Sequence, residues 1–411
     1  MARLAALVIV VALVATGGFG GGSPGASAQA PQVLKVGAPG PMQLRVGQGI
    51  NYGLTLAAGE INAAGGIMGR KITVVPEDEA ESPEVGIAAM RKLVESDKVD
   101  VIIGGQTSGV VLAQLPQISR SKIVYIGVGA SSPLITEQVR KDYANYKYIF
   151  RVSPVNSTYL GYGLADFIDE FVRPDLKAVK VAIIGENLVW VQGVVPALEK
   201  RLAEKRGVEV VYKELFDVRT TDFSPIFAKA RAAGAQFIVP LMSHASSDVV
   251  VKAYASLKVQ VPWGGIDVKQ QESDACEKLG GASVGEVVLF GSPPIKVAIT
   301  PKTIPFLDKY TERFKRAPVY TSFGAYDALY IYKQAVENAR SFDADKVIPA
   351  LEKTEYVGTE GRIAFDEAHD VRYGPGFVQL TMVQWQDGCR RALIWPRQLS
   401  TGKFVPLPWM R

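Results

Sequence analysis

Residues 99–109 have the sequence VDVIIGGQTSG, and residues 123–133 have the sequence IVYIGVGASSP. Each stretch begins with a short run of mostly β-branched apolar residues, which favours a buried strand. Glycine and hydroxyl residues follow each run, and a helix begins after them. A strand that ends in such a loop is typical of a β-α-β unit, so the two stretches predict a mostly parallel sheet.

The same alternation of short apolar runs and amphipathic stretches continues along the chain. The predicted strands are Val33–Gly37, Lys71–Pro76, Val99–Gly104, Ile123–Gly127, Val181–Gly185, Val208–Leu215, Phe237–Leu241, Val287–Phe290 and Phe377–Trp385. The predicted helices are Gln48–Ala63, Glu84–Glu95, Gly161–Phe171, Gly193–Lys205, Ser224–Ala233, Ser246–Leu257, Pro305–Phe314 and Ala325–Asn338.

This alternation is interrupted near residues 150–154, 291–294 and 356–361. Several interruptions in one chain predict an α/β fold of two Rossmann-like lobes, with parallel-sheet cores and a hinge of three segments. Ligands of such sheets bind beyond the carboxyl ends of the strands, so we expect a ligand cleft between the lobes. The predicted division assigns residues 31–153 and 288–357 to lobe 1, and residues 154–287 and 358–411 to lobe 2.

The composition excludes several classes of protein. The chain has 411 residues, of which 48% are hydrophobic and 21% charged, so it can bury a large core and is not a disordered tail. Forty-six Lys and Arg oppose 41 Asp and Glu, which gives a net charge of +5 without a cluster of basic residues. The charge pattern therefore argues against nucleic acid as a partner and against a polybasic membrane patch.

The N-terminus has the pattern of a secretion signal. Arg3 precedes the apolar stretch Leu4–Thr16, and a segment rich in Gly and Ser leads to the small-x-small pattern at Ala28–Ala30. The apolar stretch is too short to span a bilayer comfortably. We therefore predict that residues 1–30 are cleaved after Ala30. Since no cysteine lies near the cleavage point, we expect a mature protein without a lipid anchor, periplasmic or secreted.

Cys276 and Cys389 are the two cysteines, and they lie 113 positions apart. The sequence leaves two states open, a disulfide and two buried thiols, and the thiols are the favoured reading because nothing in the spacing brings the Cα atoms together. Neither cysteine has a histidine nearby in sequence, so they do not form a metal motif.

Two glycine motifs resemble known signatures without fitting them. The GxGxxxG stretch at residues 47–53 has the wrong spacing for a dinucleotide fingerprint, so we interpret its glycines as the opening of a helix whose N–H groups face a ligand. The GxSxG stretch at residues 281–285 follows a predicted helix and precedes a predicted strand. A nucleophile elbow has the reverse order, so we interpret this stretch as a loop.

The chain has only two histidines, His244 and His369. Too few are present for a His-rich metal site, and little is left for Ser-His-acid catalysis. We interpret His369 as a solvated loop residue, and the sequence leaves His244 open between the cleft and the surface. The pattern predicts neither an enzyme nor a cofactor.

The loops that follow two predicted strands are the strongest candidates for a ligand site. Gln106 and Ser108 lie in the first loop, and Gly129, Ala130 and Ser131 lie in the second. Hydroxyl groups and free N–H groups at the start of a helix suit a carboxylate without any basic residue. One such loop is equally consistent with ordinary helix capping, but two in succession favour a carboxylate site.

Three residues of the second half are further candidates. Trp190 and Ser243 follow predicted strands, and Asp267 follows a glycine-rich turn. Trp190 offers an aromatic surface for a ligand or for the core. Asp267 offers a carboxylate for a ligand ammonium group, and a solvated turn residue is the alternative.

Several segments carry a resemblance to a known family. They are GAPGP at residues 37–41, EINAAGGIMGRKI at residues 60–72, TDFSPI at residues 221–226, AAGA at residues 232–235, YDA at residues 326–328, IWP at residues 394–396 and TGK at residues 401–403. Together they resemble periplasmic solute-binding proteins of branched-chain amino-acid ABC transporters, which have the type I periplasmic binding fold. The likeness covers nearly the whole mature chain, and residues 60–72 are its most specific part.

The resemblance implies roles for particular residues. Ser108 and Ser131, with backbone groups of Gln106 and Gly129, would hold a ligand carboxylate. Trp190 would close over the ligand, Asp267 lies near the position of the ammonium-binding acid, and Tyr326 matches an aromatic residue near the cleft. The chain departs from the family around Leu44–Val46, which lacks an aromatic residue, and at Ser243, which replaces one. Both departures widen the expected pocket.

The expected function is capture of a small carboxylate-bearing solute, most simply an amino acid, and its delivery to an ABC transporter permease by a monomeric binding protein. Amides, urea and aromatic acids remain alternative ligands, and a soluble sensor that docks a receptor remains an alternative role. A secreted hydrolase would need an activated nucleophile, which the sequence does not show.

Overall fold

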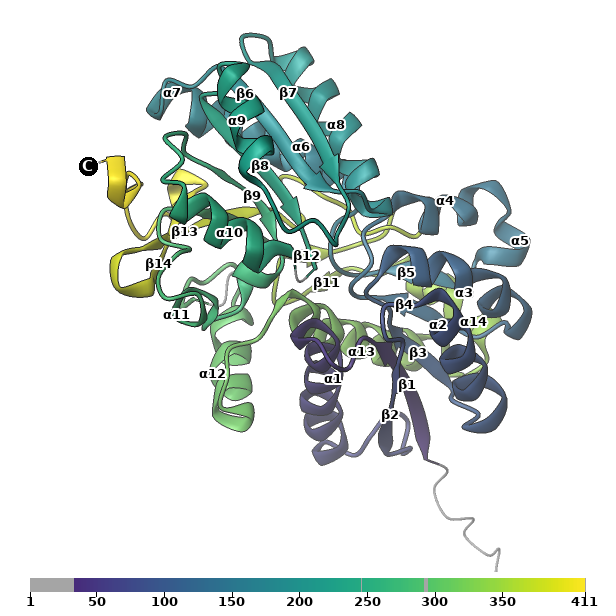
Figure 1. Cartoon of the computed structure of the whole chain (residues 1–411). Helices are drawn as coiled ribbons and strands as arrows, with labels where there is room; N and C mark the ends of the chain where they lie inside the picture. Colours follow the sequence, from purple (N-terminus) through teal and green to yellow (C-terminus); the bar gives the residue numbers. More distant parts are fainter. Residues whose placement is uncertain (1–32, 245, 292–294, 411) are drawn as a thin grey trace, which may run out of the picture.

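The structure is a computed structural model that describes residues 33–244, 246–291 and 295–410. The predicted signal segment therefore lies outside the described residues. Two lobes with mostly parallel sheets lie one above the other, and the last strands of the chain form one edge of the sheet of the upper lobe (Figure 1). The α/β fold with two lobes is confirmed.

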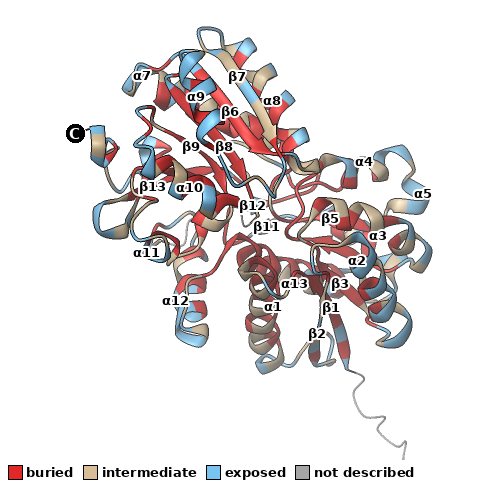
Figure 2. Ribbon diagram, in the orientation of Figure 1, coloured by how far each residue is buried: buried red, intermediate tan, exposed pale blue. Residues whose placement is uncertain are grey.

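Lobe 1 is built on five parallel strands in the order β2-β1-β3-β4-β5. Helices cover both faces: α1 and α13 pack on one side, and α2 and α3 on the other. Both faces of β1, β3, β4 and β5 are therefore largely buried, which accounts for their apolar runs, whereas the edge strand β2 is mostly half-buried (Figure 2). The strands are β1 (Leu34–Gly40), β2 (Ile72–Asp78), β3 (Val101–Gly104), β4 (Tyr125–Gly127) and β5 (Ile149–Arg151).

Lobe 2 is built on seven strands in the order β14-β13-β10-β9-β8-β6-β7. The strands from β10 to β7 are parallel, whereas β13 and β14 are antiparallel additions at one edge. The strands are β6 (Lys180–Glu186), β7 (Glu209–Phe216), β8 (Phe237–Met242), β9 (Gly264–Asp267), β10 (Val287–Phe290), β13 (Thr381–Gln386) and β14 (Arg390–Trp395), and the short pair β11 (Tyr356–Val357) and β12 (Arg362–Ile363) lies apart.

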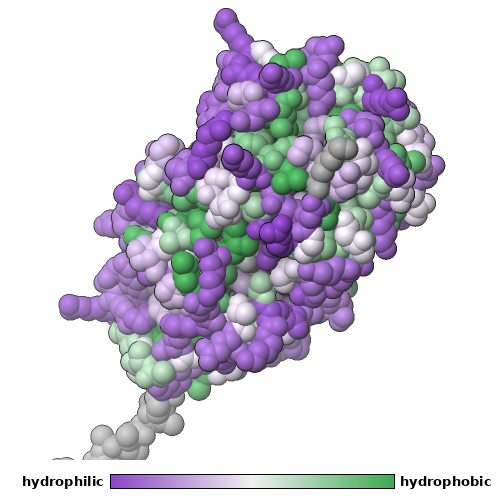
Figure 3. Space-filling model, turned by 90° about the vertical axis from the view of Figure 1, so that its left-hand side faces the viewer, coloured by the Kyte–Doolittle hydropathy of each residue, from purple (hydrophilic) through white to green (hydrophobic). Residues whose placement is uncertain are grey.

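The helices start close to the predicted positions in most cases. They are α1 (Arg45–Ala63), α2 (Pro83–Arg91), α3 (Ser108–Ser121), α4 (Pro133–Lys141), α5 (Tyr143–Tyr146), α6 (Ser157–Phe167), α7 (Arg173–Asp175), α8 (Val189–Lys205), α9 (Ser224–Ala232), α10 (Ser246–Ser256), α11 (Ala275–Lys278), α12 (Thr303–Phe314), α13 (Tyr320–Ala339) and α14 (Ala344–Glu352). On the face shown in Figure 3, hydrophilic residues cover most of the surface and hydrophobic residues gather toward the middle. None of the described helices is long and apolar enough to span a membrane.

The chain passes between the lobes later than the predicted boundaries. The strand β10 belongs to the sheet of lobe 2, so the second crossing follows Phe290 rather than residue 287. The third crossing also comes later than residue 357. Thr359 is hydrogen-bonded to Asp327 of α13, and the ring of His369 stacks on Phe150, so this part of the chain still packs on lobe 1.

The glycines of residues 47–53 have a different role from the predicted one. Gly47 lies in the first turn of α1, where a Cβ would overlap the carbonyl group of Pro41. Gly49 and Gly53 lie on the side of α1 that packs along α13, and a Cβ on Gly53 would overlap the carbonyl oxygen of Ser322 in α13. These two glycines therefore allow the two helices to approach closely, which the sequence motif alone does not reveal.

Cys276 and Cys389 form a disulfide, with their Cα atoms 5.6 Å apart. The interpretation as buried thiols was wrong, because the β13–β14 hairpin folds back beside α11 and brings together residues 113 positions apart. The bond ties the edge of the second sheet to the segment that follows β9.

The interpretation of His369 as a solvated residue was also wrong. Only 3% of it is exposed; its Nδ1 lies 3.1 Å from the acceptor carbonyl of Ile149, and its Nε2 lies 3.1 Å from the acceptor carboxylate of Glu352. The GxSxG stretch, in contrast, lies between α11 and β10 as expected, with Ser283 fully buried and bonded to Gln270. It is not a strand-to-helix elbow.

We predict that Gly53→Ala lowers the free energy of unfolding by about 1–3 kcal/mol, because the added Cβ forces α1 away from α13. Gly109→Ala in α3 is the matched control, since nothing lies within 4 Å of its Cβ position. It should change stability by less than about 1 kcal/mol. Urea denaturation followed by circular dichroism measures both, and equal effects of the two substitutions would contradict the close-approach explanation.

Candidate functional site

A cavity lies between the two lobes. Its wall combines loops of both lobes with the crossing segments. The polar or small lining residues are Gln106, Ser108, Gly129, Ser131, Ser153, Trp190, Ser243, Gln271, Gly291, Tyr320 and Glu360. The apolar ones are Val152, Pro154, Val155, Leu160, Ile266, Val268, Leu289, Val378 and Leu380.

Lobe 1 contributes two helix starts to this cavity. Ser108 is the first residue of α3, and Ser131 lies just before α4. Both side chains are nearly buried, and the Ser108 Oγ accepts a hydrogen bond of 3.2 Å from the Ser132 N–H. The Ser108 hydroxyl proton therefore remains available to a ligand. The positive ends of both helices favour an anion at the same place.

The loop that contains Ser131 is held in place by hydrogen bonds from Arg151. The guanidinium group donates hydrogen bonds to the carbonyls of Ser131 and Ser132, at 2.9 and 2.6 Å. Asp370 lies 3.6 Å from the same group and also accepts hydrogen bonds from Thr136 and Asn156. Burial lowers the pKa of Arg151 and raises that of Asp370, but their mutual attraction opposes both shifts.

Gly129 and Tyr320 fix the distance between the two loops. A Cβ on Gly129 would come within 2.6 Å of the Gly105 carbonyl oxygen, so only glycine permits this close approach. The Tyr320 hydroxyl donates to the Gly129 carbonyl at 3.1 Å and accepts from the Gln106 amide at 3.4 Å. The first residue of α13 thereby connects the loop of Gln106 with the loop of Gly129, and the two loops form one wall of the cavity.

Lobe 2 contributes Trp190 and Ser243, which the structure brings together. The indole N–H of Trp190 donates to the Ser243 hydroxyl at 3.1 Å, and this hydroxyl donates to Glu186 at 3.1 Å. Glu186 is fully buried and also accepts from the backbone N–H of Ser243 and His244. Burial favours the neutral form of Glu186, but hydrogen bonds from His244 and Ser246 outweigh it and lower its pKa. The orientation of Trp190 therefore depends on a buried carboxylate.

Two ion-pair groups connect the lobes at the cleft. The His244 ring lies 3.1 Å from Glu81 of lobe 1 and 3.3 Å from Glu186 of lobe 2. Burial alone would lower the pKa of His244, but the two carboxylates raise it. Arg45 of lobe 1 contacts Glu272 at 3.1 Å and Asp274 at 2.5 Å, both in lobe 2. These contacts place His244 at the cleft and hold the lobes together.

Asp267 does not line the cavity, which corrects the prediction. Its neighbours Ile266 and Val268 face the cavity, and successive side chains of a strand alternate between faces. The Asp267 carboxylate is fully buried behind the wall, where it accepts from Ser247 at 2.7 Å and from the backbone N–H of Lys269 at 3.1 Å. We therefore no longer propose it as a ligand contact.

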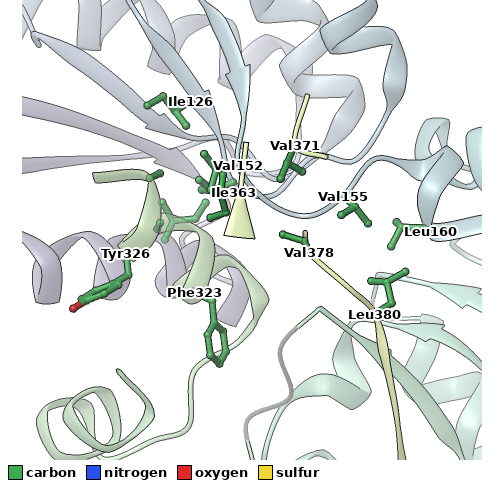
Figure 4. Packing of buried hydrophobic residues seen from close by; sticks show 14 of the residues in the cluster. Ile126, Val152, Val155, Leu160, Phe323, Tyr326, Ile363, Val371, Val378 and Leu380 are labelled. Carbon is green, nitrogen blue, oxygen red and sulfur yellow. The ribbon is translucent and has the colours of Figure 1, made fainter. Parts of the chain in front are cut away.

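Tyr326 and Ala130 also lie outside the cavity. The Tyr326 hydroxyl donates to Glu60 at 2.6 Å, and Figure 4 shows this ring pointing away from the cavity residues Leu160 and Leu380. Ala130 is buried in the core beneath α3, and its N–H donates to the Gly105 carbonyl. The remaining candidates, Gln106, Ser108, Gly129, Ser131, Trp190 and Ser243, all line the cavity, and their contact with a ligand stays a prediction.

The sequence-based prediction missed Tyr320, Gln271 and Glu360. The predicted helix began at residue 325, whereas α13 begins at Tyr320, so the aromatic residue of its first turn was overlooked. Glu360 lies at residues 356–361, where the alternation of strands and helices is interrupted. An acidic residue at a predicted crossing between lobes could have indicated a cavity residue. Within the described ranges, no group of three or more His, Cys, Asp or Glu side chains is placed to hold a metal ion.

Comparison with known proteins identifies the family. The family model described as periplasmic binding protein matches residues 37–389, so the chain belongs to this family. A Leu/Ile/Val-binding protein homolog 1 from Brucella suis is 28% identical over 388 residues, which cover 92% of this chain and 95% of the relative.

Solved structures show the same fold. A leucine-binding protein from Thermotoga maritima aligns with a TM-score of 0.75 at 20% identity, covering 88% of this chain and 98% of the other. A solute-binding protein of an ABC transporter from R. palustris, in complex with benzoate, aligns with a TM-score of 0.74 at 18% identity, covering 92% and 99%. The type I periplasmic binding fold expected from the sequence is confirmed.

The buried carboxyl groups behind the cavity make stability depend on pH. Burial raises the pKa of Asp267 to about 7, and burial together with the adjacent Asp267 raises that of Glu286 well above its usual range. No ion pair in the described part of the chain includes either residue. The folded protein therefore retains protons that the unfolded chain has released, and stability falls as the pH rises from about 4 through 7.

We predict that Glu286→Gln reduces this loss, because the amide supplies an N–H to Asp267 without a second charge. At pH 8 the variant should be more stable than the unaltered protein by about 1–3 kcal/mol, with a smaller gain at pH 5. Glu312→Gln, at an exposed position of α12, is the control and should have no pH-dependent effect. Urea denaturation at the two pH values measures this, and an equal effect of Glu286→Gln at both would contradict the prediction.

Proposed function

We propose that this protein captures a small carboxylate-bearing solute, most simply an amino acid, and delivers it to the permease of an ABC transporter. One observation carries the proposal: the N-termini of α3 and α4, with Ser108 and Ser131, converge on a cavity between two lobes. Neutral hydroxyl and N–H donors at helix starts bind a carboxylate without a basic side chain. The apolar part of the wall suits a hydrocarbon side chain.

The cross-cleft contacts support a mechanism of hinge closure. A ligand that contacts lobe 1 through Ser131 and lobe 2 through Trp190 binds the closed form more strongly than the open one. It shifts the population toward closure by this difference in affinity. The ion pairs of Arg45 and His244 also stabilise the closed form, although neither residue lines the cavity.

The names of the relatives support an amino acid as the first ligand class to test. The Brucella relative is named for leucine, isoleucine and valine, whereas the R. palustris structure contains benzoate. Aromatic acids are therefore the second class, favoured by the aromatic wall residues Trp190 and Tyr320. We further propose that residues 1–30 are a cleaved signal, that the mature protein acts outside the cytoplasm as a monomer, and that it has no enzymatic activity of its own.

We predict that Ser131→Ala and Ser108→Ala each weaken ligand binding about 10- to 100-fold, because a hydrogen bond to a charged carboxylate is lost. Residues 31–411 are unfolded and refolded to remove carried ligand, then tested by thermal unfolding against amino acids, aliphatic amides and aromatic acids. Isothermal titration of the ligand that gives the largest shift measures the two variants.

Ser121→Ala, at the opposite end of α3, is the matched control and should bind like the unaltered protein. A thermal shift confined to amides would contradict the carboxylate proposal. So would unchanged affinities in both cavity variants.

A further inference from the structure

A histidine connects the two lobes beside the cavity. His244 belongs to the loop that follows β8 in lobe 2, next to the cavity residue Ser243. Its Nε2 lies 3.1 Å from Glu81, which belongs to the loop between β2 and α2 of lobe 1. Its Nδ1 lies 3.3 Å from Glu186, the last residue of β6 in lobe 2. The imidazole ring therefore contacts one carboxylate of each lobe.

The two contacts differ in their dependence on lobe closure. Glu186 belongs to the same lobe as His244 and accepts a hydrogen bond of 3.0 Å from the His244 backbone N–H, so it stays beside the ring when the lobes separate. Glu81 belongs to the other lobe and leaves the ring when the lobes separate. Only the contact with Glu81 therefore depends on closure.

The proton content of the ring decides whether both contacts are favourable. An ionised carboxylate only accepts hydrogen bonds, and a neutral imidazole has a single N–H. The neutral ring can donate to one of the two carboxylates, and its other nitrogen then presents a lone pair to the second. The imidazolium ion donates to both and carries the charge that matches them. The closed form therefore favours the protonated ring.

The ionisable groups that face His244 are Glu81 and Glu186, and no Lys or Arg pairs with these three residues within the described ranges. Tyr320 lies near Glu81, and Asp267 lies near Glu186. Burial lowers the pKa of His244, but Glu186 and Glu81 outweigh burial and raise it. The side chain of His244 is 21% exposed and that of Glu81 is 27% exposed, so the ring can exchange its proton with water.

We propose that His244 couples ligand binding to proton uptake, because closure over a ligand brings Glu81 to the ring and stabilises the imidazolium ion. The inference rests on the proposed capture of a solute by hinge closure and adds regulation by pH to it. The pKa of His244 is then higher in the closed form than in the open form. Affinity is highest below the open-form pKa and falls as the pH rises to the closed-form pKa. One unit of difference between the two pKa values changes the affinity about tenfold.

Isothermal titration at about pH 6 and about pH 8.5 measures the coupling, with L-leucine, L-phenylalanine and benzoate as probes. For the probe that binds most tightly, we expect the unaltered protein to bind about 10-fold more strongly at the lower pH. Titration at one intermediate pH in phosphate and in Tris, which differ in ionisation enthalpy, should show a net uptake of protons.

Nuclear magnetic resonance of the imidazole rings follows the same group directly. Because the chain has only two histidines, the signals of His244 are those that disappear in His244→Asn. With the probe bound, these signals should titrate at a higher pH than in the free protein.

Glu81→Gln is the critical variant, because it removes the carboxylate that depends on closure and does not alter the cavity wall. It should reduce the ratio of the affinities at the two pH values about fivefold or more. His244→Asn should reduce the same ratio and is the second variant. Glu95→Gln, at an exposed position of lobe 1, is the matched control and should keep the full ratio.

Comparison between variants is needed because a second group titrates near the cavity. Burial raises the pKa of Glu79 to about 7, and this carboxyl group accepts a hydrogen bond from the backbone of Gln106. Its titration is present in every variant and therefore cancels when their ratios are compared.

The outcomes separate this inference from the proposed function. An equal ratio in the unaltered protein and in Glu81→Gln, or binding without proton uptake, overturns the coupling and leaves solute capture standing. Tighter binding at the higher pH has the same consequence. Failure of the three probes and of the wider ligand panel to bind at either pH overturns the proposed function itself.

Discussion

The buried guanidinium group of Arg151 is the interaction on which the site depends. It lies at the end of β5, where the chain first leaves lobe 1, and it holds the carbonyls of Ser131 and Ser132 from behind. Asp370, which belongs to the C-terminal part of the chain, lies 3.6 Å from Arg151 and balances the charge of the guanidinium group. A buried charge is stable only when such partners are in place, so this ionic contact joins the loop of Ser131 and Ser132, the first crossing and the third segment.

Other parts of the cavity wall are likewise held by buried carboxyl groups. Asp327 anchors the backbone beside Glu360, and Glu186 orients Ser243 and through it Trp190. Residues that do not line the cavity, Arg151, Asp327 and Glu186, therefore help to fix its wall. This arrangement suits a protein whose two halves must present fixed surfaces each time they close.

The sequence predicted the lobes well because hydrophobic periodicity reports burial, and the inner strands of both sheets are buried on two faces. The errors concern which face a residue occupies. Asp267 is one position from Ile266 and Val268, and one step along a strand turns a side chain to the other side. Tyr326 is six positions from Tyr320, which on a helix leaves the two side chains about 120° apart, so the two rings have different surroundings. Contacts between distant segments, such as Cys276 with Cys389, have no local signal at all.

The most direct test of this account is a crystal structure of residues 31–411 with the ligand that the binding screen identifies. The account predicts density for the ligand carboxylate against Ser108, Ser131 and the N-termini of α3 and α4, with both lobes in contact with the ligand. A carboxylate that lies instead against the wall of lobe 2, or a ligand that contacts only one lobe, would contradict it.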